Sequence, residues 1–132
     1  MDKDLKDRTR DFALRVIRLC SLLPASRTSD LIARQLLKSG TSPGAHFREA
    51  LRARSKAEYV AKMNGGLMEL EETLYWFEIV EATDLLSSEK LNAIKTETGE
   101  LIAIFVSLIK KWRGKLSESI SAFCLLLSDF RT

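Results

Sequence analysis

The sequence has few of the residues that interrupt helices or build reactive centres. Its 132 residues include two prolines, two cysteines, six glycines and one histidine. Leucine, alanine, glutamate, lysine and arginine dominate the remainder, and these residues favour helix over strand. With 45% hydrophobic and 30% charged residues, the chain resembles a globular protein of one domain with a modest core. We therefore expect an all-α protein.

The sequence also lacks a long hydrophobic run. No stretch of 18 apolar residues occurs, so the sequence predicts no membrane-spanning helix and no membrane partner. The first residues, MDKDLKDRTRDF, alternate in charge instead of forming the apolar core of a signal peptide. We therefore expect a cytoplasmic protein.

The scarcity of metal ligands and nucleophiles argues against an enzyme. A di-iron bundle needs Glu-x-x-His on two helices, which a single histidine cannot supply. Cys20 and Cys124 lack CxxC spacing and are interpreted as reduced apolar fillers. The P-loop, GxSxG and GxGxxG motifs are absent as well. We expect no catalytic residue, metal or cofactor, and leave a carboxylate-based hydrolase as a distant alternative.

Apolar residues recur at spacings of three and four in four stretches, which predicts four helices. The first helix is expected from about Asp4 to Leu23, and the third from Lys56 to about Ala82. The second should start at a cap at Thr28, Ser29 or Asp30 and continue along an apolar edge to Leu51. The fourth should start at a cap at Ser87 or Ser88 and continue along an apolar seam to Trp112. Ser55 and Glu58 form a capping box before the third stretch. Short connections between four such helices predict an up-down-up-down four-helix bundle.

The residues after Gly114 contain a short apolar cluster from Ala122 to Leu127. We interpret residues 1–114 as the bundle domain and residues 115–132 as a C-terminal tail. The tail is expected to form a short extra helical segment that packs on the bundle or on a neighbouring subunit. A tail that binds a membrane surface or a protein partner remains the alternative.

Two features of the middle helices break the usual helical pattern. Pro43 removes a backbone donor within the second stretch and predicts a kink, or a restart capped by Ser42. Gly65 and Gly66 together cost the third helix about 2 kcal/mol relative to alanine. This cost suggests that another backbone passes close to the glycines, although a tolerated weak spot is an alternative.

A polar line in the second stretch has the periodicity of a core. Its residues are spaced by four, three, four and three: Gln35, Ser39, Ser42, His46 and Glu49. A line with this spacing lies on one side of a helix. It predicts either an interface with a neighbouring subunit or a buried polar network. His46 and Glu49 are interpreted as a hydrogen-bonded pair in preference to a weak metal site.

Charge is unevenly distributed along the chain. Residues 34–62 hold seven basic and two acidic residues, a balance of +5, whereas residues 67–100 hold nine acidic and two basic residues, a balance of −7. Accumulated positive charge attracts nucleic-acid phosphates. The predicted phosphate contacts are Arg48, Arg52, Arg54, Lys56 and Lys62. These residues could instead pair with the acidic third and fourth helices of the same or a neighbouring molecule.

A resemblance to a known family covers Leu31 to Val80. The stretch LIARQLLKSGTSPGAHFREALRARSKAEYVAKMNGGLMELEETLYWFEIV resembles the four-helix bundle family linked to 23S ribosomal RNA intervening sequences. Relatives of that family include accessory proteins of diversity-generating retroelements. The most specific part is RQLLKSGTS, followed at fixed intervals by REA and by E..ET.YW. The chain departs from the usual pattern at Pro43, His46 and Met68.

The resemblance implies a small bacterial protein that assembles into a homopentamer and has no established catalytic activity in most members. For the retroelement relatives it implies a basic surface that contacts nucleic acid and a reverse transcriptase. The polar residues that the resemblance assigns to the family pattern are Arg34, Gln35, Ser39, Ser42, Glu49, Glu69 and Glu72.

These observations predict a non-enzymatic, oligomeric four-helix bundle that acts as an RNA- or DNA-binding accessory or scaffold protein. The alternative function is a protein-interaction module without nucleic-acid binding. Such a module would use the apolar tail or the acidic helices to hold its partner.

Overall fold

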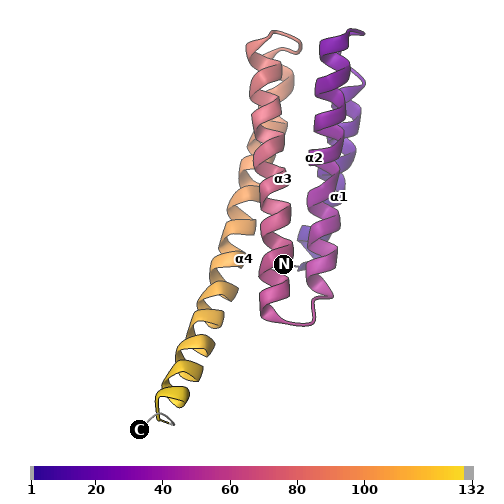
Figure 1. Ribbon diagram of the computed structural model, residues 1–132. Coiled ribbons are helices and arrows are strands. Elements are labelled where there is room, and N and C mark those ends of the chain that lie inside the picture. Colours follow the sequence, from indigo (N-terminus) through magenta and orange to yellow (C-terminus); the bar gives the residue numbers. More distant parts are fainter. Residues whose placement is uncertain (1, 130–132) are drawn as a thin grey trace.

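The protein is a bundle of four α-helices, α1 (Asp2–Cys20), α2 (Arg27–Leu51), α3 (Lys56–Ala82) and α4 (Ser88–Asp129). The computed structural model describes the backbone of residues 2–129 and the side chains of residues 5–114. Successive helices run in opposite directions, so the topology is up-down-up-down (Figure 1). The all-α prediction is therefore confirmed, and no strand occurs in the described backbone.

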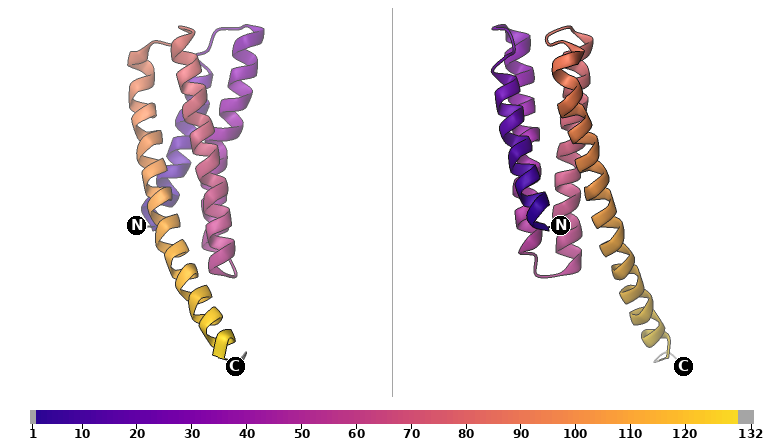
Figure 2. Two further views of the ribbon diagram at one scale, coloured as in Figure 1. Left: turned by 60° about the vertical axis from the view of Figure 1, so that its left-hand side comes forward. Right: turned by 180° about the vertical axis from the view of Figure 1, so that it is seen from behind.

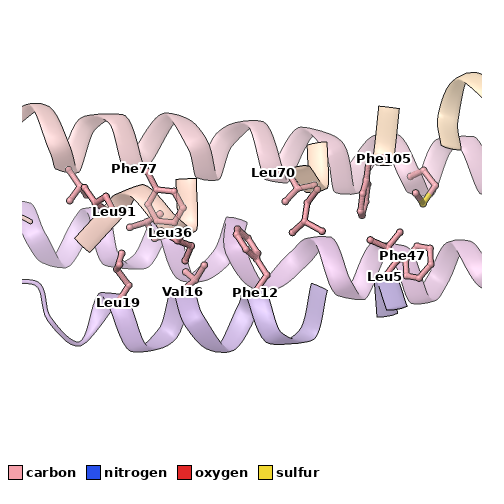
Figure 3. Packing of buried hydrophobic residues seen from close by; sticks show 14 of the residues in the cluster. Leu5, Phe12, Val16, Leu19, Leu36, Phe47, Leu70, Phe77, Leu91 and Phe105 are labelled. Atoms are coloured by element: carbon pink, nitrogen blue, oxygen red, sulfur yellow. The ribbon is translucent and has the colours of Figure 1, made fainter. Parts of the chain in front are cut away.

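The core contains one fully buried phenylalanine from each helix. Phe12, Phe47, Phe77 and Phe105 are each no more than 1% exposed. Leucine, valine and methionine side chains fill the space between them along the bundle (Figure 3). Burying such large apolar side chains supplies the main driving force for folding. The predicted periodicity of three and four is thus the pattern of one continuous core.

The start of α2 differs from the prediction. Ser26 is the N-cap, and its side-chain oxygen accepts a hydrogen bond from the Ser29 backbone N–H at 3.1 Å. The predicted caps Thr28, Ser29 and Asp30 all lie inside the helix. Ser26 has the extended backbone that an N-cap requires, whereas Ser29 is buried against the bundle.

The start of α3 agrees with the prediction. The Ser55 side-chain oxygen accepts a hydrogen bond from the Glu58 backbone N–H at 3.1 Å. The Glu58 carboxylate in turn accepts a bond from the Arg54 backbone N–H at 3.1 Å, one residue before the position that a standard capping box uses. Two otherwise unpaired donors are satisfied, which fixes the α2–α3 connection.

Helix α2 runs through Pro43 without a break, so the predicted restart is wrong. Two hydroxyl groups just before the proline bond within the helix, but neither bonds the Ser39 carbonyl, whose usual donor would be the missing N–H of Pro43. Thr41 donates to the Leu37 carbonyl and Ser42 donates to the Lys38 carbonyl, both at 2.5 Å. Pro43 itself is buried. Because α2 packs against both α1 and α3, tertiary contacts hold the helix together across the missing donor.

Three helical glycines lie directly against side chains of neighbouring helices. A Cβ on Gly40 would lie 2.7 Å from a Val16 methyl group of α1. On α3, a Cβ at Gly65 would meet the His46 ring at 2.8 Å, and one at Gly66 would meet the Phe105 ring at 2.6 Å. The α3 glycines therefore make room for side chains of α2 and α4, and not for the neighbouring backbone that the sequence suggested.

The last helix is longer than predicted. Residues 115–129 are helical, but they continue α4 and do not form a separate fifth segment. The 42-residue helix extends past the α2–α3 connection and beyond the end of the bundle (Figures 1 and 2). The predicted packing of residues 115–132 lies outside the described side chains. Within the described part of the chain, no helix is long and apolar enough to cross a bilayer.

Candidate nucleic-acid interface

The end of the bundle at the α2–α3 connection is rich in exposed basic side chains. Arg48 lies in the last turn of α2, Arg52 and Arg54 lie in the connection, and Lys56 begins α3. All four are exposed. The fifth predicted contact, Lys62, lies further along α3, and its ammonium group is 3.9 Å from the Glu49 carboxylate. Four of the five predicted residues therefore gather at one end.

Helix α4 brings further positive charge to the same end. Trp112 of α4 packs against Tyr59 of α3 with ring centroids 5.4 Å apart, and the Lys56 ammonium lies 5.9 Å from the centre of the Trp112 ring. The neighbours of Trp112 in sequence are also basic and exposed: Lys110, Lys111 and Arg113. We call the seven exposed residues the basic end: Arg48, Arg52, Arg54, Lys56, Lys110, Lys111 and Arg113.

The contribution of α4 was not predicted from the sequence. The run KKWRGK, which contains five charged or aromatic residues in six, was interpreted only as the end of the α4 apolar seam. Its charge density was a usable signal. Its place beside the α2–α3 connection could not be predicted, because about half of the chain separates the two segments in sequence. The contacts of Trp112 with Tyr59 and Lys56 place the two basic segments together.

A groove opens at the basic end beside Trp112. Its volume is about 340 Å³, and its lining is Ala50, Leu51, Ala53, Arg54, Ser55, Lys56, Tyr59 and Trp112. We call it the Trp112 groove. Its lining combines aliphatic and aromatic side chains with the positive charges of Arg54 and Lys56. A groove of this composition suits a ligand that is flat, partly apolar and attached to anionic groups.

The electrostatics of the basic end favour an anionic partner. Residues 48–62 and 110–114 hold eight basic and two acidic residues. Glu49 is already close to Lys62, and Glu58 is bound to a backbone N–H. Among residues 5–114, none of the seven basic-end side chains forms an ion pair within 4.0 Å. The suggested pairing with acidic helices of the same molecule does not occur in the described part.

The polar line of α2 is placed mainly against α3 of the same chain. Ser39 is fully buried, and its hydroxyl oxygen lies 2.9 Å from the hydroxyl oxygen of Thr73. His46 packs against the two α3 glycines, and its Nδ1 atom lies 3.8 Å from the Glu49 carboxylate, too far for the predicted hydrogen bond. Gln35 is half-buried. Ser42, also half-buried, bonds within its own helix. The line thus contributes a small polar contact between α2 and α3.

The three residues that came from the family resemblance alone, Arg34, Glu69 and Glu72, have separate surroundings. Arg34 is exposed on α2. Glu72 accepts a hydrogen bond from the Trp76 indole at 3.4 Å. One carboxylate oxygen of Glu69 is buried without a hydrogen-bond partner in the described structure. Within residues 5–114, no hydrogen bond or ion pair joins Glu49, Glu69 and Glu72, so the structure does not support a shared carboxylate centre there.

The remaining candidates for reactivity are also weak. Burial raises the pKa of the Cys20 thiol to about 11, which keeps it protonated near neutral pH. Its sulfur lies 3.9 Å from the Ala33 carbonyl oxygen, consistent with a structural role. Cys124 lies outside the described side chains. Across the part of the chain with described side chains, no group of three or more metal ligands occurs.

The sequence model of the 23S rRNA-intervening sequence protein family matches residues 1–107. The chain belongs to this family. The matched residues include α1, α2, α3 and the first part of α4. The 23S rRNA-intervening sequence protein match ends before Lys110 and Trp112, so the α4 part of the basic end lies beyond it.

A solved structure from the same group of proteins supports the fold. The chain is 35% identical to a protein of unknown function from the S23 ribosomal protein family of Bacteroides thetaiotaomicron, whose crystal structure was determined at 1.70 Å. The TM-score is 0.76, and the alignment covers 80% of this chain and 98% of the other. Curated proteins give no match. Membership in the 23S rRNA-intervening sequence protein family thus establishes the fold but leaves the activity open.

Proposed function

We propose that the protein is a non-enzymatic, oligomeric four-helix bundle that binds the backbone of RNA or DNA through its basic end. The observation that carries this proposal is that seven exposed basic residues lie at one end of the bundle, four around the α2–α3 connection and three on the turn of α4 that contains Trp112. Such a cluster releases counterions from nucleic acid when it neutralises phosphates, which gives affinity without sequence preference. The aromatic groove among these residues adds a surface for bases.

Charge reversal in the α2–α3 connection tests the proposal. The double variant Arg52→Glu/Arg54→Glu is expected to bind a labelled RNA or DNA at least about 10-fold more weakly than the native protein, because it loses two phosphate contacts and gains repulsion. Its affinity should also depend less steeply on salt. Fluorescence anisotropy at several salt concentrations measures both effects.

The matched control reverses two exposed arginines on α1, in the variant Arg10→Glu/Arg18→Glu. This variant has the same net charge as Arg52→Glu/Arg54→Glu, but its basic end is intact. Equal losses in the two variants would show that only total charge matters. Undiminished binding after the change of Arg52 and Arg54 would contradict the assignment of the interface.

We also propose that the protein forms a homo-oligomer, with the pentamer that the resemblance implies as the expected size. Exposed large apolar side chains support assembly, since Met68 is 72% exposed and Tyr75 is 52% exposed on α3. The acidic residues around them would favour a basic or polar neighbour. The mass of the particle in solution tests this assembly.

The second candidate function is a protein-interaction module, and the length of α4 favours it. The helix continues beyond the bundle through a sequence with an apolar cluster at residues 122–127. A reverse transcriptase is the partner that the resemblance to the retroelement accessory proteins implies. Deletion of residues 117–132 is expected to abolish co-purification of a protein partner and to leave nucleic-acid affinity intact. Lost nucleic-acid affinity in the truncated protein would count against this separation of roles.

A further inference from the structure

The Trp112 groove points to a more specific ligand than nucleic acid in general. We propose that the groove receives one unpaired nucleobase, so that the basic end prefers single-stranded RNA or DNA to a duplex. This inference rests on the proposed function and names its substrate class. It concerns a residue outside the matched family region, because that region ends at residue 107.

The aromatic geometry provides the stacking surface. The rings of Trp112 and Tyr59 lie 5.4 Å apart and are tilted by 52°, so two aromatic side chains line one groove at an angle to each other. Both side chains are half-buried, which holds them in place while leaving part of each accessible. Stacking on a preorganised aromatic ring costs little conformational entropy and accepts any base, because every base has a π face.

The charge arrangement connects the base to its backbone. Lys56 holds its ammonium group 5.9 Å from the centre of the Trp112 ring, and Arg54 lines the same groove. A base that enters the groove replaces the Lys56 ammonium against the indole, and Lys56 then pairs with the attached phosphate. The complex thus replaces the cation–π contact between Lys56 and Trp112 by base stacking on Trp112, and it gains a charge-assisted contact between Lys56 and the phosphate.

The same geometry discriminates against duplexes. Bases in a duplex are paired and stacked on their neighbours, so they reach a groove only after extrusion, which costs a few kcal/mol. The phosphates of a duplex still reach Arg48, Arg52 and the exposed α4 side chains, because these residues lie outside the groove lining. The groove therefore adds affinity for single strands to a charge-driven affinity that both forms share.

Intrinsic fluorescence provides a direct test. The chain has two tryptophans, so the variant Trp76→Phe leaves Trp112 as the sole reporter. It is titrated with RNA and DNA single strands of about ten nucleotides, which matches the length of strand that small binding domains occupy. The two further probes are a duplex and an abasic strand of equal length. The single strands should quench Trp112, whereas the abasic strand should bind through its phosphates and leave the fluorescence unchanged.

Two substitutions at Trp112 measure the contribution of stacking. Trp112→Leu keeps an apolar side chain but removes the ring, and should weaken single-strand binding by about 5- to 140-fold, the range expected for one stacked base. Trp112→Phe keeps an aromatic ring and should therefore retain most of the native affinity for single strands. Neither change should alter binding of the abasic strand. If Trp112→Leu fails to fold, the quenching data and the comparison of abasic with normal strands still decide.

The outcomes separate the inference from the proposed function. If Arg52→Glu/Arg54→Glu weakens binding of all four probes while Trp112→Leu weakens none, the interface is correct and the groove proposal is overturned. Equal affinity for the abasic and normal strands also overturns it. If the native protein binds none of the probes, both proposals fail. Unequal responses of RNA and DNA would identify which strand the groove prefers.

Discussion

Replacement of Phe105 by alanine is expected to lower the free energy of unfolding by about 3–5 kcal/mol. The Phe105 ring is fully buried, lies 6.3 Å from the Phe47 ring and fills the space that Gly66 leaves open. Removing it leaves a cavity where α2, α3 and α4 meet. Since a whole domain is stable by only about 5–15 kcal/mol, this single change removes a large part of the total.

Urea denaturation of purified variants measures the effect. Phe105→Leu is the matched variant, because it keeps most of the apolar volume and should cost less than Phe105→Ala. Lys38→Ala is the surface control, since Lys38 is exposed on α2, away from the proposed assembly surface, and the change should stay within about 0.5 kcal/mol. Equal stabilities for Phe105→Ala and Lys38→Ala would show that Phe105 does not close the core.

Replacement of Gly40 by alanine is expected to destabilise the protein by about 2–3 kcal/mol, although alanine favours helix. The new Cβ would lie 2.7 and 2.8 Å from the two Val16 methyl groups and 3.0 Å from the Val16 Cβ. No rotamer of Val16 relieves the contact with its own Cβ, so α1 and α2 must move apart. The cost of lost packing then exceeds the gain in helix propensity.

Gly99→Ala is the matched control for Gly40→Ala. Both glycines lie within helices, but a Cβ on Gly99 would meet no other atom within 4 Å. The Gly99 variant should therefore gain about 0.5–1 kcal/mol from helix propensity alone. Thermal and denaturant unfolding should show opposite signs for the two substitutions. The same sign in both variants would contradict the close approach of α1 and α2.

The sequence was sufficient for the parts of the fold that local physics controls. The bounds of α3 and its cap at Ser55 were predicted correctly, because capping chemistry and apolar spacing are both encoded within a few residues. The number of helices was predicted for the same reason, from apolar spacings of three and four. The continuation of α2 through Pro43 was not predicted, since the contacts that maintain the helix come from α1 and α3.

The candidate site was predictable only in part. Charge density identified Arg48, Arg52, Arg54 and Lys56, which lie close together because they are close in sequence. Periodicity showed that the polar line of α2 faces a neighbour but could not show which one, and for Ser39 and His46 that neighbour is α3 of the same chain. The Trp112 groove was invisible in the sequence, because it needs the contact of α3 with α4.

The continuous α4 helix sets a fixed distance between the two proposed binding regions, the basic end and the far end of α4. At a rise of 1.5 Å per residue, the stretch from Gly114 to Asp129 is a rod of about 22 Å that starts at the basic end. A protein held at the tip of this rod would be close enough to touch a nucleic acid bound at its base. In a complex of all three molecules, the length of this helix would set the distance between the bound nucleic acid and the protein partner.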